Sequence, residues 1–259
     1  MINRILKKLR VAWSIIPYFR NPLRYTLAYY SILPSPNRLD LKNGDSFITE
    51  DYKSAFSVIK EIYAMKEYDP ALKGLREEPL IIDIGANIGV FDVRAKRMYP
   101  KSKIISYEPF GNNFNLLKKN LALNKVENVF TYKLGVADKK QVKTLYIHKE
   151  NLGANSLYNK TDTTVKIFTI SLNQAFSQNK ISKCDLLKLD CEGAEFDILY
   201  NASKSTFNKI NKIFLEYHDY SNSGKAEDLA KFIANQGFNV KLRPFAVDRS
   251  LGYILAERN

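Results

Sequence analysis

The sequence predicts an α/β protein with a mainly parallel sheet, helices on both of its faces and a C-terminal antiparallel hairpin. From residue 80 onward, short apolar runs typical of buried strands alternate with segments of helical periodicity. The last two strand-like runs, residues 238–242 and 252–256, have no helical segment between them, which indicates the hairpin. A basic helical segment precedes this pattern.

The size and composition of the chain fit one domain with a small addition. The chain has 259 residues, of which 45% are hydrophobic and 26% charged, as in ordinary globular proteins. We assign residues 39–259 to the domain and residues 1–38 to an N-terminal segment. Cys184 and Cys191 form neither a disulfide framework nor a zinc motif, so we expect reduced cysteines in a cytoplasmic protein.

Positive charge is concentrated at the N-terminus. The net charge is +13, and residues 1–39 hold seven Lys or Arg and no acidic residue. Residues 2–16 have the periodicity of an amphipathic helix with one apolar and one basic face. Such a helix either lies peripherally on an anionic membrane or packs on its own domain, and the sequence leaves both open while favouring packing. The apolar run at residues 11–19 is too short to span a membrane.

The individual elements follow from the same patterns. Asn43-Gly44 predicts the turn of a hairpin over residues 39–50, and a helix is expected over residues 51–68. Further strands are predicted at 80–84, 103–107, 129–134, 184–189 and 210–217, and further helices at 88–98, 112–123, 194–202 and 226–236. An irregular, Thr-rich stretch with short strands separates the third of these strands from the fourth. Ligands of such sheets bind beyond the carboxyl ends of the strands.

The first candidate site is Asp83-Ile84-Gly85-Ala86-Asn87-Ile88-Gly89, which joins the first of these strands to its helix. A dinucleotide fingerprint would require glycines at positions 87 and 90, where Asn87 and Val90 stand, so NAD and FAD are disfavoured. A P-loop lysine is absent as well. A tight glycine turn preceded by an acid suits a cofactor with an ammonium group and no phosphate. S-adenosylmethionine is such a molecule, and we expect Asp83 to meet its ammonium directly or through water.

Two acids at later strand ends complete the predicted cofactor site. Glu108, within Tyr107-Glu108-Pro109, follows Asp83 by 25 residues, and an acid at this place accepts hydrogen bonds from ribose hydroxyls. Asp138 comes after the third strand and either accepts a hydrogen bond from the adenine amino group or serves as a turn residue. The cofactor-binding candidates are Asp83, Gly85, Ala86, Asn87, Gly89, Glu108, Pro109 and Asp138.

Candidate catalytic residues lie where the next two strands end. In Lys188-Leu189-Asp190-Cys191-Glu192, alternation places Lys188 and Asp190 on one face. Acids here suit a metal ion, a general base or a hold on the amino group of the cofactor. We predict no metal site and assign Asp190 and Glu192 to the chemistry. Glu195, in the first turn of the next helix, is interpreted as a capping acid.

The following strand ends in Glu216 and His218, which share a face by alternation. The ordinary pKa of histidine, about 6.5, suits a general base, so we predict that His218 is catalytic. Residues 153–157 are expected to form a loop over the cleft. There Asn155 and Ser156 either bind the acceptor or belong to a plain turn, and the sequence leaves both open.

Five segments together carry a family resemblance: IIDIGANIGVF (81–91), YEPF (107–110), GANSL (153–157), LLKLDCEGAEFDIL (186–199) and IFLEYHD (213–219). The chain resembles the FkbM family of S-adenosylmethionine-dependent methyltransferases over residues 39–256. The resemblance implies a single Rossmann-like class I methyltransferase domain that methylates hydroxyls on sugars, glycans, glycolipids or similar small molecules. It also implies cofactor contacts by Asp83, Gly85, Asn87, Gly89 and Glu108.

Two other functions are kept as alternatives. The positive charge is compatible with a nucleic-acid methyltransferase. Many enzymes that methylate base amino groups carry an Asn/Asp-Pro-Pro-aromatic loop after the fourth strand, however, and this sequence contains no Pro-Pro pair, so we do not expect a nucleic-acid partner. A non-enzymatic, membrane-associated binding protein that kept the fold would have to have lost cofactor binding.

Overall fold

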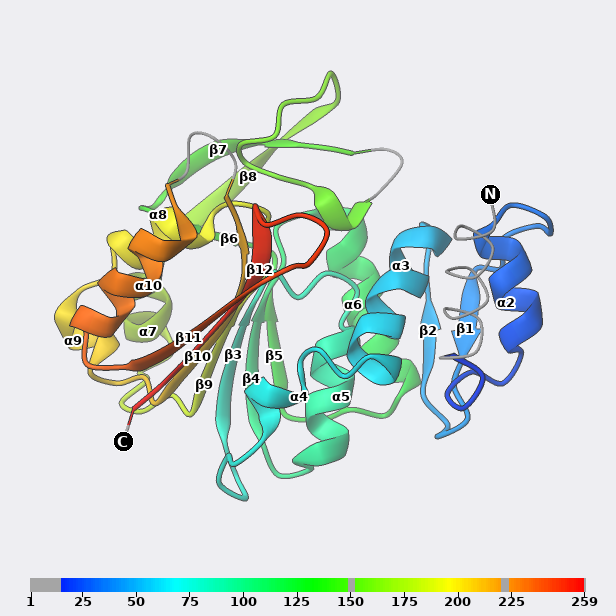
Figure 1. Cartoon of the computed structure of the whole chain (residues 1–259), viewed down its shortest axis with the longest axis horizontal. Coiled ribbons are helices and arrows are strands. Elements are labelled where there is room, and N and C mark those ends of the chain that lie inside the picture. The colour runs from blue at the N-terminus through cyan, green and yellow to red at the C-terminus, as the bar shows by residue number, and fades with distance from the viewer. Residues whose placement is uncertain (1–14, 149–151, 220–223, 259) are drawn as a thin grey trace.

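A computed structural model describes residues 15–148, 152–219 and 224–258. A seven-stranded sheet in the order β11-β12-β10-β9-β3-β4-β5 runs through its centre (Figure 1). Five of these strands are parallel, and β12 is antiparallel to both of its neighbours. The bounds are β3 (Leu80–Ile84), β4 (Lys103–Tyr107), β5 (Val129–Tyr132), β9 (Leu186–Leu189), β10 (Lys212–His218), β11 (Asn239–Pro244) and β12 (Leu251–Glu257).

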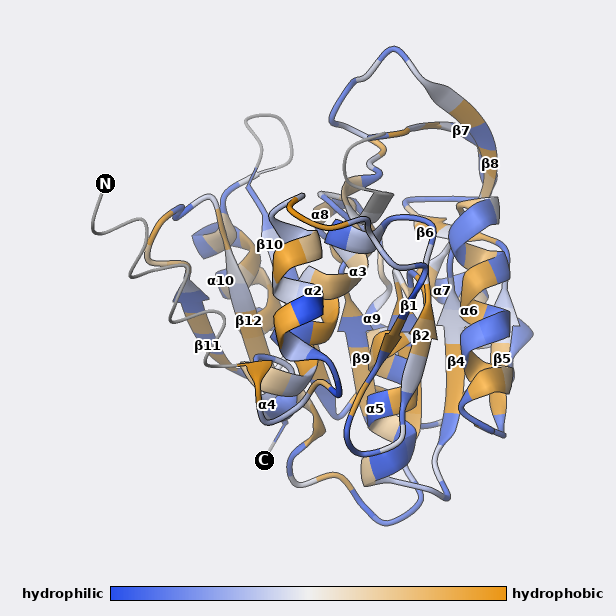
Figure 2. Cartoon of the chain, turned by 90° about the vertical axis from the view of Figure 1, so that its right-hand side faces the viewer, coloured by the Kyte–Doolittle hydropathy of each residue, from blue (hydrophilic) through white to orange (hydrophobic). Residues whose placement is uncertain are grey.

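Helices cover both faces of this sheet because successive strand residues point to opposite sides. Ile81 packs in the core beneath α5 and α6, and Ile82 packs in the core beneath α7, α8 and α10. Figure 2 shows apolar residues along the central strands and on the helix faces next to them. The helices are α4 (Asp69–Leu72), α5 (Val90–Met98), α6 (Gly111–Leu123), α7 (Leu172–Gln178), α8 (Glu195–Tyr200), α9 (Lys204–Phe207) and α10 (Ala226–Asn235).

The Thr-rich stretch is more regular than the sequence predicts. It forms a second sheet from β6 (Gly135–Ala137), β7 (Gln141–Tyr146) and β8 (Thr164–Ser171), with a short 3₁₀ turn at Leu152–Ala154. Helix α7 follows, and its start is set by a capping box between Ser171 and Gln174. Strand β8 has eight residues, but exposed polar side chains interrupt its apolar pattern, which is why the sequence alone indicates only short strands.

The N-terminal part packs against the outer side of α5 and α6. It comprises α2 (Pro22–Tyr29), β1 (Arg38–Asp40), β2 (Ser46–Ile48), α3 (Tyr52–Ile59) and a π-helical turn, η1 (Lys60–Ala64). Ile15, Phe19 and Tyr25 are buried in the same core as Phe56, with the rings of Phe19 and Phe56 5.3 Å apart. Residues 2–14 of the predicted amphipathic helix lie outside the described residues.

Helix α6 also protects the edge of the small β1–β2 hairpin. The amide of Asn120 accepts from the backbone N–H of Ile48 at 2.7 Å and donates to its carbonyl at 3.1 Å. Asn124 makes the same pair of bonds with Ser46, at 2.9 and 2.7 Å. Two side chains thus replace a neighbouring strand and satisfy backbone groups that would otherwise be unpaired.

Most predicted elements are present. The strands at 80–84 and 103–107 have the predicted bounds, and both hairpins are found. The helix predicted over 51–68 is shorter, since it passes into the π-helical turn and ends at Ala64. Within the described residues, no helix is long and apolar enough to cross a membrane.

The shared core predicts that the N-terminal segment stabilises the whole domain. Phe19→Ala removes a fully buried ring and should lower the free energy of unfolding by about 3–5 kcal/mol. Leu23→Ala, on the neighbouring helix with a side chain 72% exposed, is the matched control and should change it by less than about 0.5 kcal/mol. Urea unfolding followed by circular dichroism measures both. Equal, small effects would show that this segment folds apart from the domain.

Candidate active site

The site lies where the strand order reverses, between β3 and its neighbour β9. From β3 the chain proceeds outward through β4 and β5, whereas β9 leads to β10 on the other side. Loops that follow β3 and β9 therefore diverge, and a cleft opens beyond the strand ends. The two loops nevertheless touch at one point, since the backbone N–H of Asp190 donates to the carbonyl of Ile84 at 3.0 Å.

Gly85 is the residue that permits this contact. Its φ of +81° is in the left-handed region, and a Cβ atom there would lie 1.8 Å from the carbonyl oxygen of Asp190. Only glycine satisfies both conditions. The turn predicted from Gly85 and Gly89 therefore brings the backbone after β3 directly against the backbone after β9.

A buried charge cluster supports this turn from behind. Asp83 and Lys188 are paired in register on the parallel strands β3 and β9, and their side chains form an ion pair of 2.9 Å. The Lys188 ammonium also donates to the carbonyl of Gly85 at 2.9 Å. Burial, followed by the charge of Asp83, raises the pKa of Asp92 well above its ordinary value, so Asp92 keeps a proton beside Asp83.

This geometry corrects the role predicted for Asp83. Its side chain is fully buried and does not line the cleft, and its charge is used by Lys188. Alternation along β3 turns Asp83 toward α5 rather than toward the cleft. We therefore treat Asp83 as a residue that positions the glycine turn, and Ala86 and Gly89 also lie behind the surface of the cleft.

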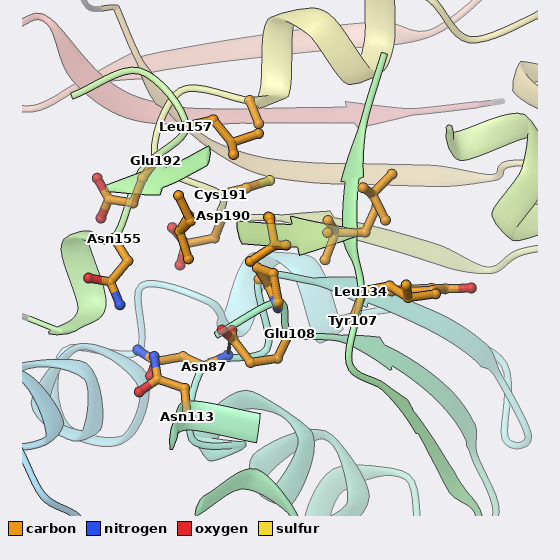
Figure 3. A pocket seen from close by; sticks show the side chains of 18 of the residues that line it. Asn87, Tyr107, Glu108, Asn113, Leu134, Asn155, Leu157, Asp190, Cys191 and Glu192 are labelled. Atoms are coloured by element: carbon orange, nitrogen blue, oxygen red, sulfur yellow. Dashed lines mark hydrogen bonds between the residues drawn. The ribbon is translucent and has the colours of Figure 1, made fainter. Parts of the chain in front are cut away.

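The cleft itself, here called the strand-end cleft, encloses about 660 Å³ of empty space up to its open mouth. Its polar wall comes from the loops after β3, β4 and β9 (Figure 3). Its apolar wall comes from the small sheet and includes Leu134, Val136, Leu145, Leu157 and Ile167. Four of the predicted cofactor-binding residues line it: Gly85, Asn87, Glu108 and Pro109.

Glu108 occupies the floor of the strand-end cleft. One of its carboxylate oxygens accepts from the backbone N–H of Asn87 and the other from that of Phe110, both at 2.9 Å. Burial raises the pKa of Glu108 to about 7, and the two backbone N–H groups oppose that shift. The carboxylate is held in place, and each oxygen keeps a second lone pair for a ligand hydroxyl.

Asp138 does not reach the strand-end cleft, which corrects the adenine contact considered for it. Its carboxylate pairs with Lys143 at 2.7 Å and accepts from Gln141.

Asn155, which the sequence offers as a residue that binds the acceptor, lines the strand-end cleft together with the cofactor-binding candidates. Its side-chain oxygen accepts from the backbone N–H of His148. Its amide nitrogen is buried without a hydrogen-bond partner among the described residues. A ligand acceptor atom would satisfy that nitrogen.

A second cavity, here called the acidic pocket, adjoins the first and measures about 860 Å³ including its open part. Carboxylates of Glu61, Asp190, Glu192 and Glu216 line it, together with Tyr29 and Tyr68. Asn87, Gly153, Asp190 and Glu192 line both cavities. Atoms bound in the two cavities would meet at these shared residues.

Asp190 is anchored at this junction by a tyrosine that no sequence motif indicates. The hydroxyl of Tyr68 lies 2.8 Å from Asp190 Oδ2 and 3.2 Å from Glu216 Oε2. Lys188 lies 3.7 Å from the same Asp190 oxygen, so the two side chains share a face as predicted. Tyr68 comes from the segment before the first motif, where its apolar neighbours look like ordinary core residues.

The surroundings of His218 change the role predicted for it. Burial disfavours the charged ring, but Glu195, Glu192 and Asp190 together outweigh it and raise the pKa of His218 to about 10. The ring nitrogens lie 3.4 Å from Glu192 and 3.5 Å from Glu195. His218 is therefore a cation at neutral pH, and in this state it has no free lone pair with which to accept a proton.

Two further residues have structural roles. Glu195 has the structural role predicted for it, but it does not cap its helix: its carboxylate accepts from the backbone N–H groups of Cys191 and Gly193, in the loop before α8, at 2.7 and 2.9 Å. Ser156 is buried and donates to the carbonyl of Glu192 at 2.6 Å. Ser156 thus ties the loop over the cleft to the loop after β9 and does not face an acceptor. No group of three His, Cys, Asp or Glu suited to a metal ion occurs in the described part of the chain.

Comparison with known proteins identifies the family. Residues 83–240 match the Methyltransferase FkbM domain. The chain belongs to the FkbM methyltransferase family. Methyltransferase 1 of Beauveria bassiana is 26% identical over 225 residues, which cover 77% of this chain and 88% of that protein. The 31-O-demethyl-FK506 methyltransferase FkbM of Streptomyces tacrolimicus is 22% identical, and the alignment covers 78% and 88% of the two chains.

A solved structure shares the fold. Methyltransferase FkbM from Methylobacillus flagellatus KT superposes with a TM-score of 0.51 at 14% identity, covering 80% of this chain and 54% of that one. The family member described here is thus an S-adenosylmethionine-dependent methyltransferase with the expected Rossmann-like fold. The strand-end cleft fits such a cofactor, because it combines an anchored acid, an unpaired amide donor and an apolar wall.

The buried charge cluster predicts a pH-dependent loss of stability in Lys188→Met. Removing the ammonium leaves Asp83 buried beside Asp92 without its ion-pair partner, which should cost about 3–5 kcal/mol of unfolding free energy at pH 8. Burial already raises the pKa of Asp83 in the wild type, against the charge of Lys188, and loss of Lys188 raises it further above its unfolded value. The stability of the variant is then present at low pH and lost as the pH rises.

Urea unfolding at pH 5 and pH 8 tests this, with Lys118→Met on the exposed side of α6 as the control. The deficit of Lys188→Met relative to the wild type should be smaller at pH 5. A deficit that is the same at both pH values, or no larger than that of the control, would contradict the assignment.

Proposed function

We propose that this methyltransferase transfers a methyl group from S-adenosylmethionine to a hydroxyl of a sugar, glycan, glycolipid or similar small molecule. The observation that carries the proposal is the junction of the two cavities, where Asp190 faces both. One cavity takes the cofactor and the other takes the acceptor. The name of the Streptomyces relative describes a substrate with a demethylated oxygen, which supports an oxygen acceptor in this family.

In the strand-end cleft, Glu108 is proposed to accept hydrogen bonds from the two ribose hydroxyls of the cofactor. Asn155 donates from its unpaired amide nitrogen, and the apolar residues of the small sheet hold the adenine. The bound cofactor supplies a methyl group on a positively charged sulfur. These contacts would direct that methyl toward the junction, where holding donor and acceptor in line would supply much of the rate.

At the junction, Asp190 is proposed to accept the proton of the acceptor hydroxyl. It lies between Tyr68 and Lys188, and its side chain is 27% exposed, so it is fixed but still reachable. The imidazolium of His218 lies 3.4 Å from Glu192 and positions its carboxylate beside the same junction. His218 thus acts through Glu192 and remains a positioning residue.

The acidic lining also bears on the nucleic-acid alternative. A polyanionic acceptor would have to bring its phosphates against the carboxylates of Glu61, Asp190, Glu192 and Glu216. Ionised carboxylates repel phosphate groups, most strongly where solvent is excluded. The pocket therefore supports a small acceptor without phosphates.

Asp190→Asn should lower kcat at least about 100-fold, the usual contribution of a general base, because the amide cannot take up the proton of the hydroxyl. The affinity for S-adenosylhomocysteine should change only a few-fold. Transfer of a labelled methyl group to an acceptor found by screening hydroxyl compounds measures the first, and calorimetry measures the second. Asp228→Asn on the exposed face of α10 is the control. An Asp190→Asn enzyme with wild-type kcat would exclude Asp190 as the proton acceptor.

Glu108→Gln should weaken binding of S-adenosylhomocysteine at least about tenfold, because its NH₂ would face a backbone N–H donor in place of an acceptor oxygen. The wild-type affinity should also fall as the pH drops from 8 to 6, since the Glu108 carboxylate takes up a proton near pH 7. The variant has no such titration. Calorimetry at pH 6 and pH 8 measures the affinity of both proteins for S-adenosylhomocysteine. A variant that binds as tightly as the wild type would contradict the assignment of Glu108 to the cofactor site.

A further inference from the structure

The acidic pocket has a charge opposite to that of the chain. The whole sequence carries a net charge of +13, yet four carboxylates and a single ammonium, that of Lys53, are found among the described residues lining this cavity. Three of these carboxylates come from the strand-end loops and strand β10. The fourth, Glu61, comes from the π-helical turn η1, which contributes to the lining of the same pocket.

Three of the four carboxylates have partners within the protein. The hydroxyl of Tyr68 lies within hydrogen-bond distance of both Asp190 and Glu216, with Asp190 the nearer acceptor for its single proton. Glu192 lies beside the His218 cation. Glu61 makes no hydrogen bond or ion pair with any described residue. Its carboxylate is therefore available to a ligand in a cavity that adjoins the methyl-transfer junction.

Two carboxyl groups of this pocket have raised pKa values. Burial raises the pKa of Glu61 to about 7; the charge of Lys60 opposes that shift and the charge of Asp190 adds to it. Burial and the charge of Asp190 likewise raise the pKa of Glu216 well above its ordinary value. A cation bound between Glu61 and Glu216 would favour the ionised form of both carboxyl groups against the effect of burial, so binding and ionisation support each other.

The geometry favours an organic cation over a metal ion. A divalent metal needs several oxygen ligands gathered within a few ångströms. The described residues of the pocket form no such group, although they surround a cavity of about 860 Å³. An ammonium group on a larger molecule can use carboxylates that are spread over a wall, since each N–H bond points in its own direction.

We propose that the acceptor carries an ammonium group close to the hydroxyl that is methylated, and that Glu61 and Glu216 bind this group. The inference rests on the proposed function, which takes the acidic pocket as the acceptor site. Asp190 then faces the hydroxyl, while the ammonium lies deeper in the pocket. The substrate class is an amino alcohol, for example an amino sugar or an amine-bearing natural product.

One wall of the acidic pocket precedes the residues that match the family domain. Tyr29, Lys53, Ser57 and Glu61 all precede residue 83, where the match to the FkbM domain begins. Of the two proposed ammonium-binding residues, Glu61 therefore lies before the matched range and Glu216 lies within it.

Three probes on one ring test the proposal: trans-2-aminocyclohexanol, trans-cyclohexane-1,2-diol and trans-2-hydroxycyclohexanecarboxylate. They present a cation, a neutral group and an anion next to the same hydroxyl. Dissociation constants are measured at pH 8 by ligand-observed NMR on the full chain saturated with S-adenosylhomocysteine. We expect the amine to bind at least about tenfold more tightly than the diol, a difference of about 1.4 kcal/mol, and the acid to bind more weakly than both.

Glu61→Gln should weaken binding of the amine about tenfold and leave the diol unchanged, because the amide keeps the shape and loses the charge. In the wild type, affinity for the amine should fall as the pH drops from 8 to 6 and Glu61 becomes protonated. Glu227→Gln, an exposed glutamate of α10 outside the pocket, is the matched control and should bind all three probes as the wild type does.

The outcomes separate this inference from the function on which it rests. Failure of the folded protein to bind S-adenosylhomocysteine overturns both. Binding of S-adenosylhomocysteine together with equal affinity for amine and diol, or with an unchanged amine affinity in Glu61→Gln, overturns the amine proposal alone.

Discussion

The ion pair between Asp83 and Lys188 is the interaction on which the active site depends. It joins β3 to β9 at the point where the strand order reverses, and Lys188 also holds the carbonyl of Gly85. Both cavities are bounded by the loops that follow these two strands. A buried pair of this kind costs desolvation, which only good geometry and additional hydrogen bonds repay. In this protein the ion pair and the additional hydrogen bond from Lys188 fix the turn at Gly85 against the backbone of Asp190.

From that fixed point the two cavities acquire different chemistry. The strand-end cleft has one anchored acid, Glu108, opposite an apolar wall, and suits a cofactor with a ribose and a flat base. The acidic pocket gathers carboxylates around Tyr68 and the π-helical turn. A strongly basic chain can therefore hold a locally negative site, because net charge describes the whole protein and not one cavity.

The candidate site shows where reasoning from motifs succeeds. Glu108, Asn87, Asp190 and Glu192 line the cavities because each directly follows a strand that the sequence identifies. Asp83 lies within the predicted strand, but its side chain is buried against its register partner Lys188, which is 105 residues away, and does not line the cleft. Likewise His218 is at the predicted place, but its charge state depends on Glu192 and Glu195, whose proximity only the folded chain reveals.

The sequence by itself determined the α/β class, the bounds of β3 and β4 and the family, because buried strands and glycine turns are set by local residue patterns. Only the tertiary structure decided which charges meet. Tyr68 and Glu61 belong to no motif, and their roles arise because the residues between α3 and β3 pack beside the strand-end loops. The ionisation of His218 and Glu108 was decided in the same way, since burial and neighbouring charges act through space and not along the chain.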